Sequence, residues 1–124
     1  MPIPEKYDAL LHFFLQDTAD DIGAVAAAAT SYGVIVPENC QLVAVFMAAM
    51  DAAIDAGGAI NILVNGVDTT EDLTYTTAAA AASQKLGFPQ EGPELAAGDV
   101  LQLDCDGATT TTPFARYTYV LRRL

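Results

Sequence analysis

Two stretches near the end of the chain alternate apolar and polar side chains, residue by residue. In the first, apolar residues share one parity and polar residues the other: Leu101, Leu103 and Cys105 against Gln102, Asp104 and Asp106. In the second, the same pattern recurs: Tyr117, Tyr119 and Leu121 against Arg116, Thr118 and Arg122. Because successive side chains of a β-strand point to opposite faces, this period of two predicts half-buried strands within residues 95–107 and 114–124.

A hairpin is predicted at residues 60–75, where Asn65-Gly66 separates two runs of β-forming residues. Asn-Gly readily adopts the positive φ angles of a tight β-turn. Turn signals recur about every 10 residues elsewhere, as in the Gly- and Pro-rich segment 87–94. This spacing predicts a mainly β protein, an antiparallel β-sandwich or jelly roll of about 7–8 short strands.

Earlier strands are expected at residues 9–16, where aromatic and aliphatic side chains gather, at the β-branched run 33–36, and at residues 40–50. The last of these has large apolar residues on both parities, which predicts a strand buried on both faces. A helix over about 42–56 competes with it, because the stretch is rich in helix formers. We favour a strand followed by a loop or a short helical turn near 50–57.

The alanine-rich segment 22–32 fits either a helix or a strand. Its composition favours a helix, yet alanines give a poor apolar stripe for docking one. The 124 residues suit one domain, which we expect at 9–124, with 1–8 as an extended N-terminal arm containing two prolines. Only 17% of the residues are charged, against about 25% in typical proteins, which favours an extra buried face such as an oligomer contact.

Charge excludes some partners. Sixteen acidic residues against five basic ones give a formal net charge of −11. Nucleic acids and anionic membranes repel such a chain, because binding to either depends on Lys and Arg. Three of the five basic residues, Arg116, Arg122 and Arg123, lie within the last nine positions. They form either a solvated strand or a basic end that docks on an acidic neighbour, including a second copy of the chain.

No motif predicts a catalytic, metal or cofactor site, so we expect neither an enzyme nor a cofactor. Cys40 and Cys105 match no zinc spacing, and His12 is the sole histidine. We expect buried free thiols, with a disulfide as the alternative. Asp104 and Asp106 suit a solvated strand face better than an acid–base pair. The acidic group at 17–21 lacks the glycine and final glutamate of a calcium loop.

A carbohydrate-binding module is an alternative function. Tyr117 and Tyr119 share one parity, as a sugar platform would require, and the threonine run 109–112 precedes their strand. Core packing is the preferred interpretation of both rings, because the alternation places them on the apolar side. The N-terminus lacks the basic start and apolar run of a signal peptide, and no apolar stretch reaches the roughly 20 residues of a membrane span. We therefore expect synthesis in the cytoplasm.

The second half of the chain resembles the β-sandwich proteins of tailed-phage virions, which include head decoration (cement) proteins and fibre modules. The resemblance is carried by INILVNG at 60–66 and by residues 95–124, where an Ala-Gly-Asp-Val turn leads into a D-x-D strand, a polar loop and a final strand. GVIVPENCQLVAVFM at 33–47 is similar to an earlier strand of those modules. The segments 22–32 and 50–58 depart from the pattern and leave the strand order open.

The resemblance implies a structural function. A decoration protein would sit on the capsid exterior, bind the major capsid protein, stabilise its lattice and form a homo-oligomer. The two termini are the expected contact segments, with these candidate residues: Ile3, Tyr7, Arg116, Arg122, Arg123 and Leu124. A fibre or tail-tip module is the alternative within the same class of virion proteins.

Overall fold

The structure is a computed structural model, and it describes residues 10–23, 29–88 and 92–124. The predicted arm at 1–8 lies outside the described residues, as does the middle of the alanine-rich segment. Among the described residues there are strands, turns and bridges but no helix. The mainly β prediction is therefore confirmed. No described helix is long and apolar enough to cross a membrane.

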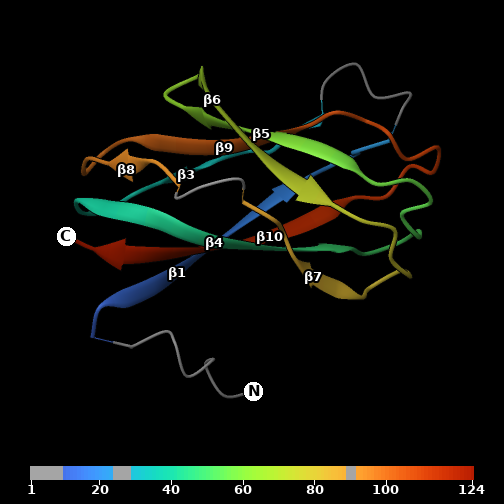
Figure 1. Cartoon of the computed structure of the whole chain (residues 1–124), viewed down its shortest axis with the longest axis horizontal. Helices are drawn as coiled ribbons and strands as arrows, with labels where there is room; N and C mark the ends of the chain where they lie inside the picture. Colours follow the sequence, from blue (N-terminus) through green and yellow to red (C-terminus); the bar gives the residue numbers. More distant parts are fainter. Residues whose placement is uncertain (1–9, 24–28, 89–91) are drawn as a thin grey trace.

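Two antiparallel sheets of five strands each lie face to face, with β9 and β5 in the upper layer and β4 and β10 in the lower layer of Figure 1. Sheet A runs β1-β10-β4-β7, and β8 also pairs with β4; its strands are β1 (His12–Ala19), β4 (Cys40–Ala49), β7 (Ser83–Lys85), β8 (Glu94–Leu95) and β10 (Ala115–Arg123). Sheet B runs β2-β9-β5-β6, and β3 also pairs with β9; its strands are β2 (Ala29–Thr30), β3 (Val34–Ile35), β5 (Gly58–Val64), β6 (Val67–Tyr75) and β9 (Val100–Cys105).

The alternation in the last two strands defines the core. Leu101 and Leu103 of β9 and Tyr117 and Tyr119 of β10 are fully buried between the sheets. Their polar neighbours in the sequence face outward, as predicted. β10 is central in sheet A, between β1 and β4, and β9 is central in sheet B. The two strands with the clearest alternation are therefore the ones around which both sheets assemble.

The Asn-Gly hairpin joins β5 to β6. Asn65 has φ 52° and Gly66 has φ 80°, the positive values expected for this turn. The Asn65 side chain also ties the turn to sheet B, donating from Nδ2 to Asp99 Oδ1 at 3.0 Å and accepting from the Val100 N–H at 2.9 Å. The hairpin prediction is confirmed, and the turn is fastened to the start of β9.

The first strand begins three residues later than predicted, at His12 rather than residue 9, and it continues to Ala19. The sequence suggests a turn at Asp17, yet this residue lies within β1 and is buried. Its carboxylate accepts hydrogen bonds from the Tyr119 hydroxyl at 2.7 Å and the Gly33 N–H at 2.9 Å. A carboxylate satisfied in this way can be buried at the edge of a core.

The segment 50–57 forms no helical turn. Ile54, which is buried, instead makes an isolated antiparallel bridge with Ala78, in which each N–H donates to the other residue's carbonyl. The large apolar side chains of the segment are Met50 and Ile54 alone, too few for a helical stripe that could dock on the core. The chain has more strands than the seven or eight predicted, because β2, β3, β7 and β8 are only two or three residues long.

Candidate functional site

The outer face of sheet A, called face A below, is the best candidate for a functional surface. Strand register places its side chains in rows, because directly paired residues point to the same side of a sheet. The first two rows are Thr18–Arg116–Ala48–Ser83 and Gln16–Thr118–Phe46–Lys85. The next two are Phe14–Val120–Ala44 and His12–Arg122–Gln41–Glu94. Face A therefore combines an apolar middle row with polar and basic rows on either side.

The apolar middle of face A is separate from the core. Ala44 and Val120 are fully buried, and Val43 and Phe46 pack against them in a second cluster. A β-bulge between Val120 and Leu121 leaves Val43 as the extra residue of β4, so that it joins the cluster beside Ala44. The prediction that residues 40–50 are buried on both faces is confirmed in part: Ala44 is buried on the outer side of β4, whereas Phe46 and Ala48 are partly exposed there.

An open groove of about 640 Å³ crosses face A, lined by the side chains of the first two rows other than Lys85, together with Asp17, Met47 and neighbouring loop residues. Arg116 is exposed at this groove, and Lys85 is exposed beside Phe46. Among the described residues neither cation forms an ion pair, and the one ion pair present joins Arg123 to Glu38. Face A thus presents two cationic side chains that are free to bind an acidic group of another molecule.

The three C-terminal arginines, which the sequence groups together, have different roles. Arg116 faces the groove, whereas Arg122 lies at the other end of β10 and donates to Gln41 Oε1. Arg123 is used within the chain: its Nε lies 2.6 Å from Glu38 Oε1, and its guanidinium lies 5.0 Å from the ring centre of Phe13.

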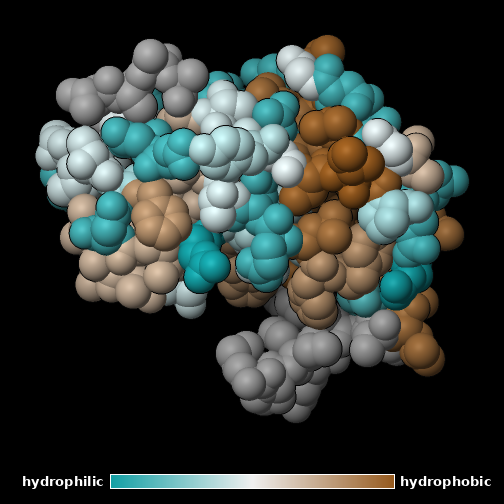
Figure 2. Space-filling view, turned by 180° about the vertical axis from the view of Figure 1, so that it is seen from behind, coloured by the Kyte–Doolittle hydropathy of each residue, from teal (hydrophilic) through white to brown (hydrophobic). Residues whose placement is uncertain are grey.

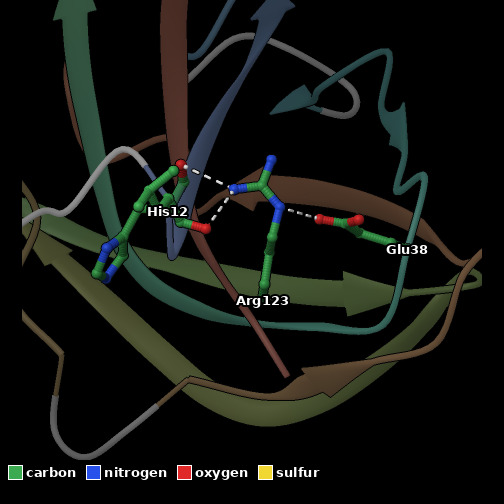
Figure 3. A network of polar contacts seen from close by, with 4 residues as sticks. His12, Glu38 and Arg123 are labelled. Carbon is green, nitrogen blue, oxygen red and sulfur yellow. Dashed lines mark hydrogen bonds and ion pairs between the residues drawn. The ribbon is translucent and has the colours of Figure 1, made fainter.

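Arg123 also fastens the end of β10 to the beginning of β1. Its Nη1 donates to the backbone carbonyls of Leu10 at 3.2 Å and His12 at 3.4 Å (Figure 3). Because the guanidinium is held by a carboxylate, two carbonyls and a ring, we do not include Arg123 in the candidate surface. The predicted contact residues Ile3 and Tyr7 lie outside the described residues.

Leu124 is 63% exposed, and its N–H donates to the Asn39 carbonyl at 3.3 Å. Leu11, which is 52% exposed, accepts from the Arg123 N–H and so lies at the same end of the molecule. Figure 2 shows apolar side chains gathered toward the side that carries the C-terminus in Figure 1. This end is a second apolar area, and its cation Arg122 is already engaged by Gln41 Oε1, whereas no described side chain engages Arg116.

Tyr117 and Tyr119 are fully buried, so they cannot form a sugar-binding platform. The preferred interpretation of both rings as core residues is confirmed. Burial raises the pKa of each phenol well above its ordinary value, and the negative charge of Asp17 adds to the shift. The two hydroxyls differ in one respect. The Tyr119 hydroxyl donates to Asp17, whereas the Tyr117 hydroxyl has no hydrogen-bond partner among the described residues.

The threonine loop before β10 is organised by Asp55, a residue that sequence reasoning missed. The Asp55 carboxylate accepts from the Thr110 N–H at 2.8 Å and from the Thr109 hydroxyl at 2.9 Å, and it also accepts from the Thr110 hydroxyl. These hydrogen bonds lower the pKa of Asp55. The only hint in the sequence is a polar residue next to an isolated isoleucine, which does not indicate a partner 55 positions away.

The remaining candidate residues have structural roles. Asp106 accepts from the Ala59 N–H at 2.8 Å and the Tyr75 hydroxyl at 2.7 Å, which closes the end of β9. Asp104 accepts from the Thr30 hydroxyl at 3.0 Å. Among the described residues, no three or more His, Cys, Asp or Glu side chains are grouped to hold a metal ion.

Cys40 and Cys105 are buried free thiols, as expected. Burial is the largest cause that raises the pKa of both, in the case of Cys40 to about 11. Both groups are therefore protonated at neutral pH, which makes them poor nucleophiles. Comparisons with protein families, with curated proteins and with solved structures find no match for this chain.

Proposed function

We propose that this protein is a structural component of a virion, which binds other proteins through face A and acts as a capsid decoration (cement) protein. The observation that carries the proposal is the composition of face A. Phe14 and Phe46 give it an apolar centre, and Arg116 and Lys85 are unpaired cations beside that centre. An apolar centre with a charged rim is typical of protein-binding surfaces.

The virion role rests on the resemblance of residues 33–47, 60–66 and 95–124 to tailed-phage β-sandwich proteins. The partner it implies is the major capsid protein, met on the outside of the shell. Binding of this chain to each repeated lattice site would stabilise the assembled shell by mass action, without any chemistry. A fibre or tail-tip position remains the competing assignment.

The test uses capsids of the encoding virus that have been stripped of this protein. Purified chain added back should co-sediment at a fixed copy number per capsomer and raise the temperature at which the shell releases its DNA. Arg116→Glu should weaken co-sedimentation, whereas Ala96→Glu/Ala97→Glu, which changes the net charge equally at an exposed turn, should not. No binding to the shell, or label found on the tail by electron microscopy, would contradict the decoration role.

A further inference from the structure

The outer face of sheet B, called face B, is the electrostatic opposite of face A. The five strands of sheet B contain no Lys, Arg or His. One row of face B reads Thr30–Asp104–Asn61–Asp72, and the next reads Gln102–Leu63–Asp68. Asp68 and Asp72 are exposed, and Leu63 is partly exposed between the acidic positions. Face B therefore has an acidic surface with an apolar residue at its centre.

Sheet A has the reverse composition. Its strands contain every Lys and Arg among the described residues, and their only acidic residues are Asp17 and Glu94. Asp17 is buried, so Glu94 is the one acidic side chain in the rows of face A. A chain with a net charge of −11 thus has one basic face and one acidic face on opposite sides of the same sandwich.

The spacing of the charges on the two faces is similar. Arg116 and Lys85 lie two strands and two residues apart in the register of sheet A, which corresponds to about 12 Å. Asp104 and Asp72 lie two strands apart in one row of sheet B, which corresponds to about 10 Å. Two cations of one copy can therefore meet two carboxylates of another while the apolar centres touch.

We propose that face A binds face B of a second copy of this chain. Because the two faces lie on opposite sides of the sandwich, the contact is heterologous: each copy uses face A on one neighbour and face B on the other. Such a contact closes into a ring or extends as a stack. The test of this inference contains no molecule other than this chain, so it can fail or succeed independently of capsid binding. Face A holds one partner at a time, so in a stack only the terminal copy keeps face A free for a capsid.

The size of the faces indicates a weak association. The strands of sheet A contain 32 residues and those of sheet B contain 26, which at about 4.8 Å between strands and about 3.3 Å per residue cover roughly 500 and 400 Å². The two faces together bury about 900 Å², below the roughly 1,200–2,000 Å² of stable specific interfaces and within the range of weak, transient ones. Association should therefore depend on concentration. At 0.15 M salt the Debye length is about 8 Å, so repulsion from distant acids is screened while contacting charges still interact.

Sedimentation equilibrium of the full chain at 0.15 M salt provides the test. The wild-type mass should rise with concentration past that of a dimer. Arg116→Glu on face A and Asp72→Lys on face B should each weaken association at least tenfold. Two control variants change the net charge by the same amounts at an exposed turn outside the rows of face A and face B. These are Ala96→Glu/Ala97→Glu and Ala96→Lys/Ala97→Lys, and both should leave association unchanged. Among the described residues, neither the Arg116 nor the Asp72 side chain forms a hydrogen bond or an ion pair, so each variant should fold, and circular dichroism checks this.

The decisive experiment mixes the two face variants. The Asp72→Lys variant keeps an intact face A, and the Arg116→Glu variant keeps an intact face B, so an equimolar mixture should associate when neither variant does alone. A wild-type chain that stays monomeric, or a mixture that stays monomeric, would overturn the proposal. Loss of association with Arg116→Glu but not with Asp72→Lys would overturn it in favour of a symmetric contact between two copies of face A. Association that depends on residues 1–9 but not on Asp72 would overturn it in favour of that segment as the occupant of face A.

Discussion

Replacing Tyr119 by phenylalanine should destabilise the fold, whereas the same replacement at Tyr117 should not. Both rings are fully buried, lie two positions apart on β10 and point into the same core. The Tyr119 hydroxyl donates to the buried carboxylate of Asp17 at 2.7 Å, and the Tyr117 hydroxyl has no partner among the described residues. Hydrogen bonds to a charged group contribute about 1.5–3 kcal/mol, so we expect Tyr119→Phe to cost about 2 kcal/mol.

Tyr117→Phe removes a buried polar group that gains no hydrogen bond on folding, so its cost should be near zero or the variant should be slightly more stable. Urea unfolding followed by far-ultraviolet circular dichroism measures both, because the chain has no tryptophan to report by fluorescence. A loss of about 2 kcal/mol would lower Tm by roughly 8 °C in a domain of this size. Equal losses for the two variants, or a larger loss for Tyr117→Phe, would refute the assignment of the stabilisation to the Asp17 contact.

Three other predictions concern local features. The pKa of the Cys40 thiol is raised to about 11 in the folded chain, so the unfolded chain loses this proton at lower pH. The free energy of unfolding should therefore fall as pH rises from about 9 to 11. Cys40→Ala should reduce that fall, as measured by urea titrations at pH 8 and 10.5. Gly66→Val should cost about 1–2 kcal/mol of unfolding free energy, because φ is +80° there while an added Cβ would touch nothing within 4 Å; an unchanged urea midpoint would contradict this. Asp55→Ala should lower the protection factor of the Thr110 N–H against hydrogen exchange, and acidification through the lowered pKa of Asp55 should lower it in the wild type; protection retained in the variant would show that the loop is held otherwise.

The parts of the fold that follow a simple period could be predicted from the sequence. β9 and β10 alternate because each has one face on the core and one on solvent, and the buried set includes Leu103 and Tyr119 as expected. The apolar residues on both parities of β4 likewise indicated two buried faces. In each case the pattern is local, because the side chains of one strand report the environment of both its faces.

The parts that depend on distant partners could not be predicted. Asp17 continues β1 because Tyr119, 102 positions away, donates to it. β7 is only three residues long, too short to show an alternation of apolar and polar residues in the sequence. It is a strand because it pairs with β4. Similarly, Arg123 has the same charge as Arg116, and only the fold shows that the first is fastened to Glu38 while the second faces the groove.

The net charge of a whole chain is therefore a poor guide to its contacts when the fold places the cations on one face and the acidic residues on another. Lys85 and Arg116 are 31 positions apart in the sequence, yet β4 pairs with both of their strands and brings them to one face. Beyond a Debye length of about 8 Å, the acids on the far side of the sandwich contribute little to an encounter with that face. A partner that meets face A encounters a locally basic surface on an acidic protein. Face B of a second copy offers a complementary acidic surface, so the self-association proposed above rests on the same topology that brings the cations of face A together.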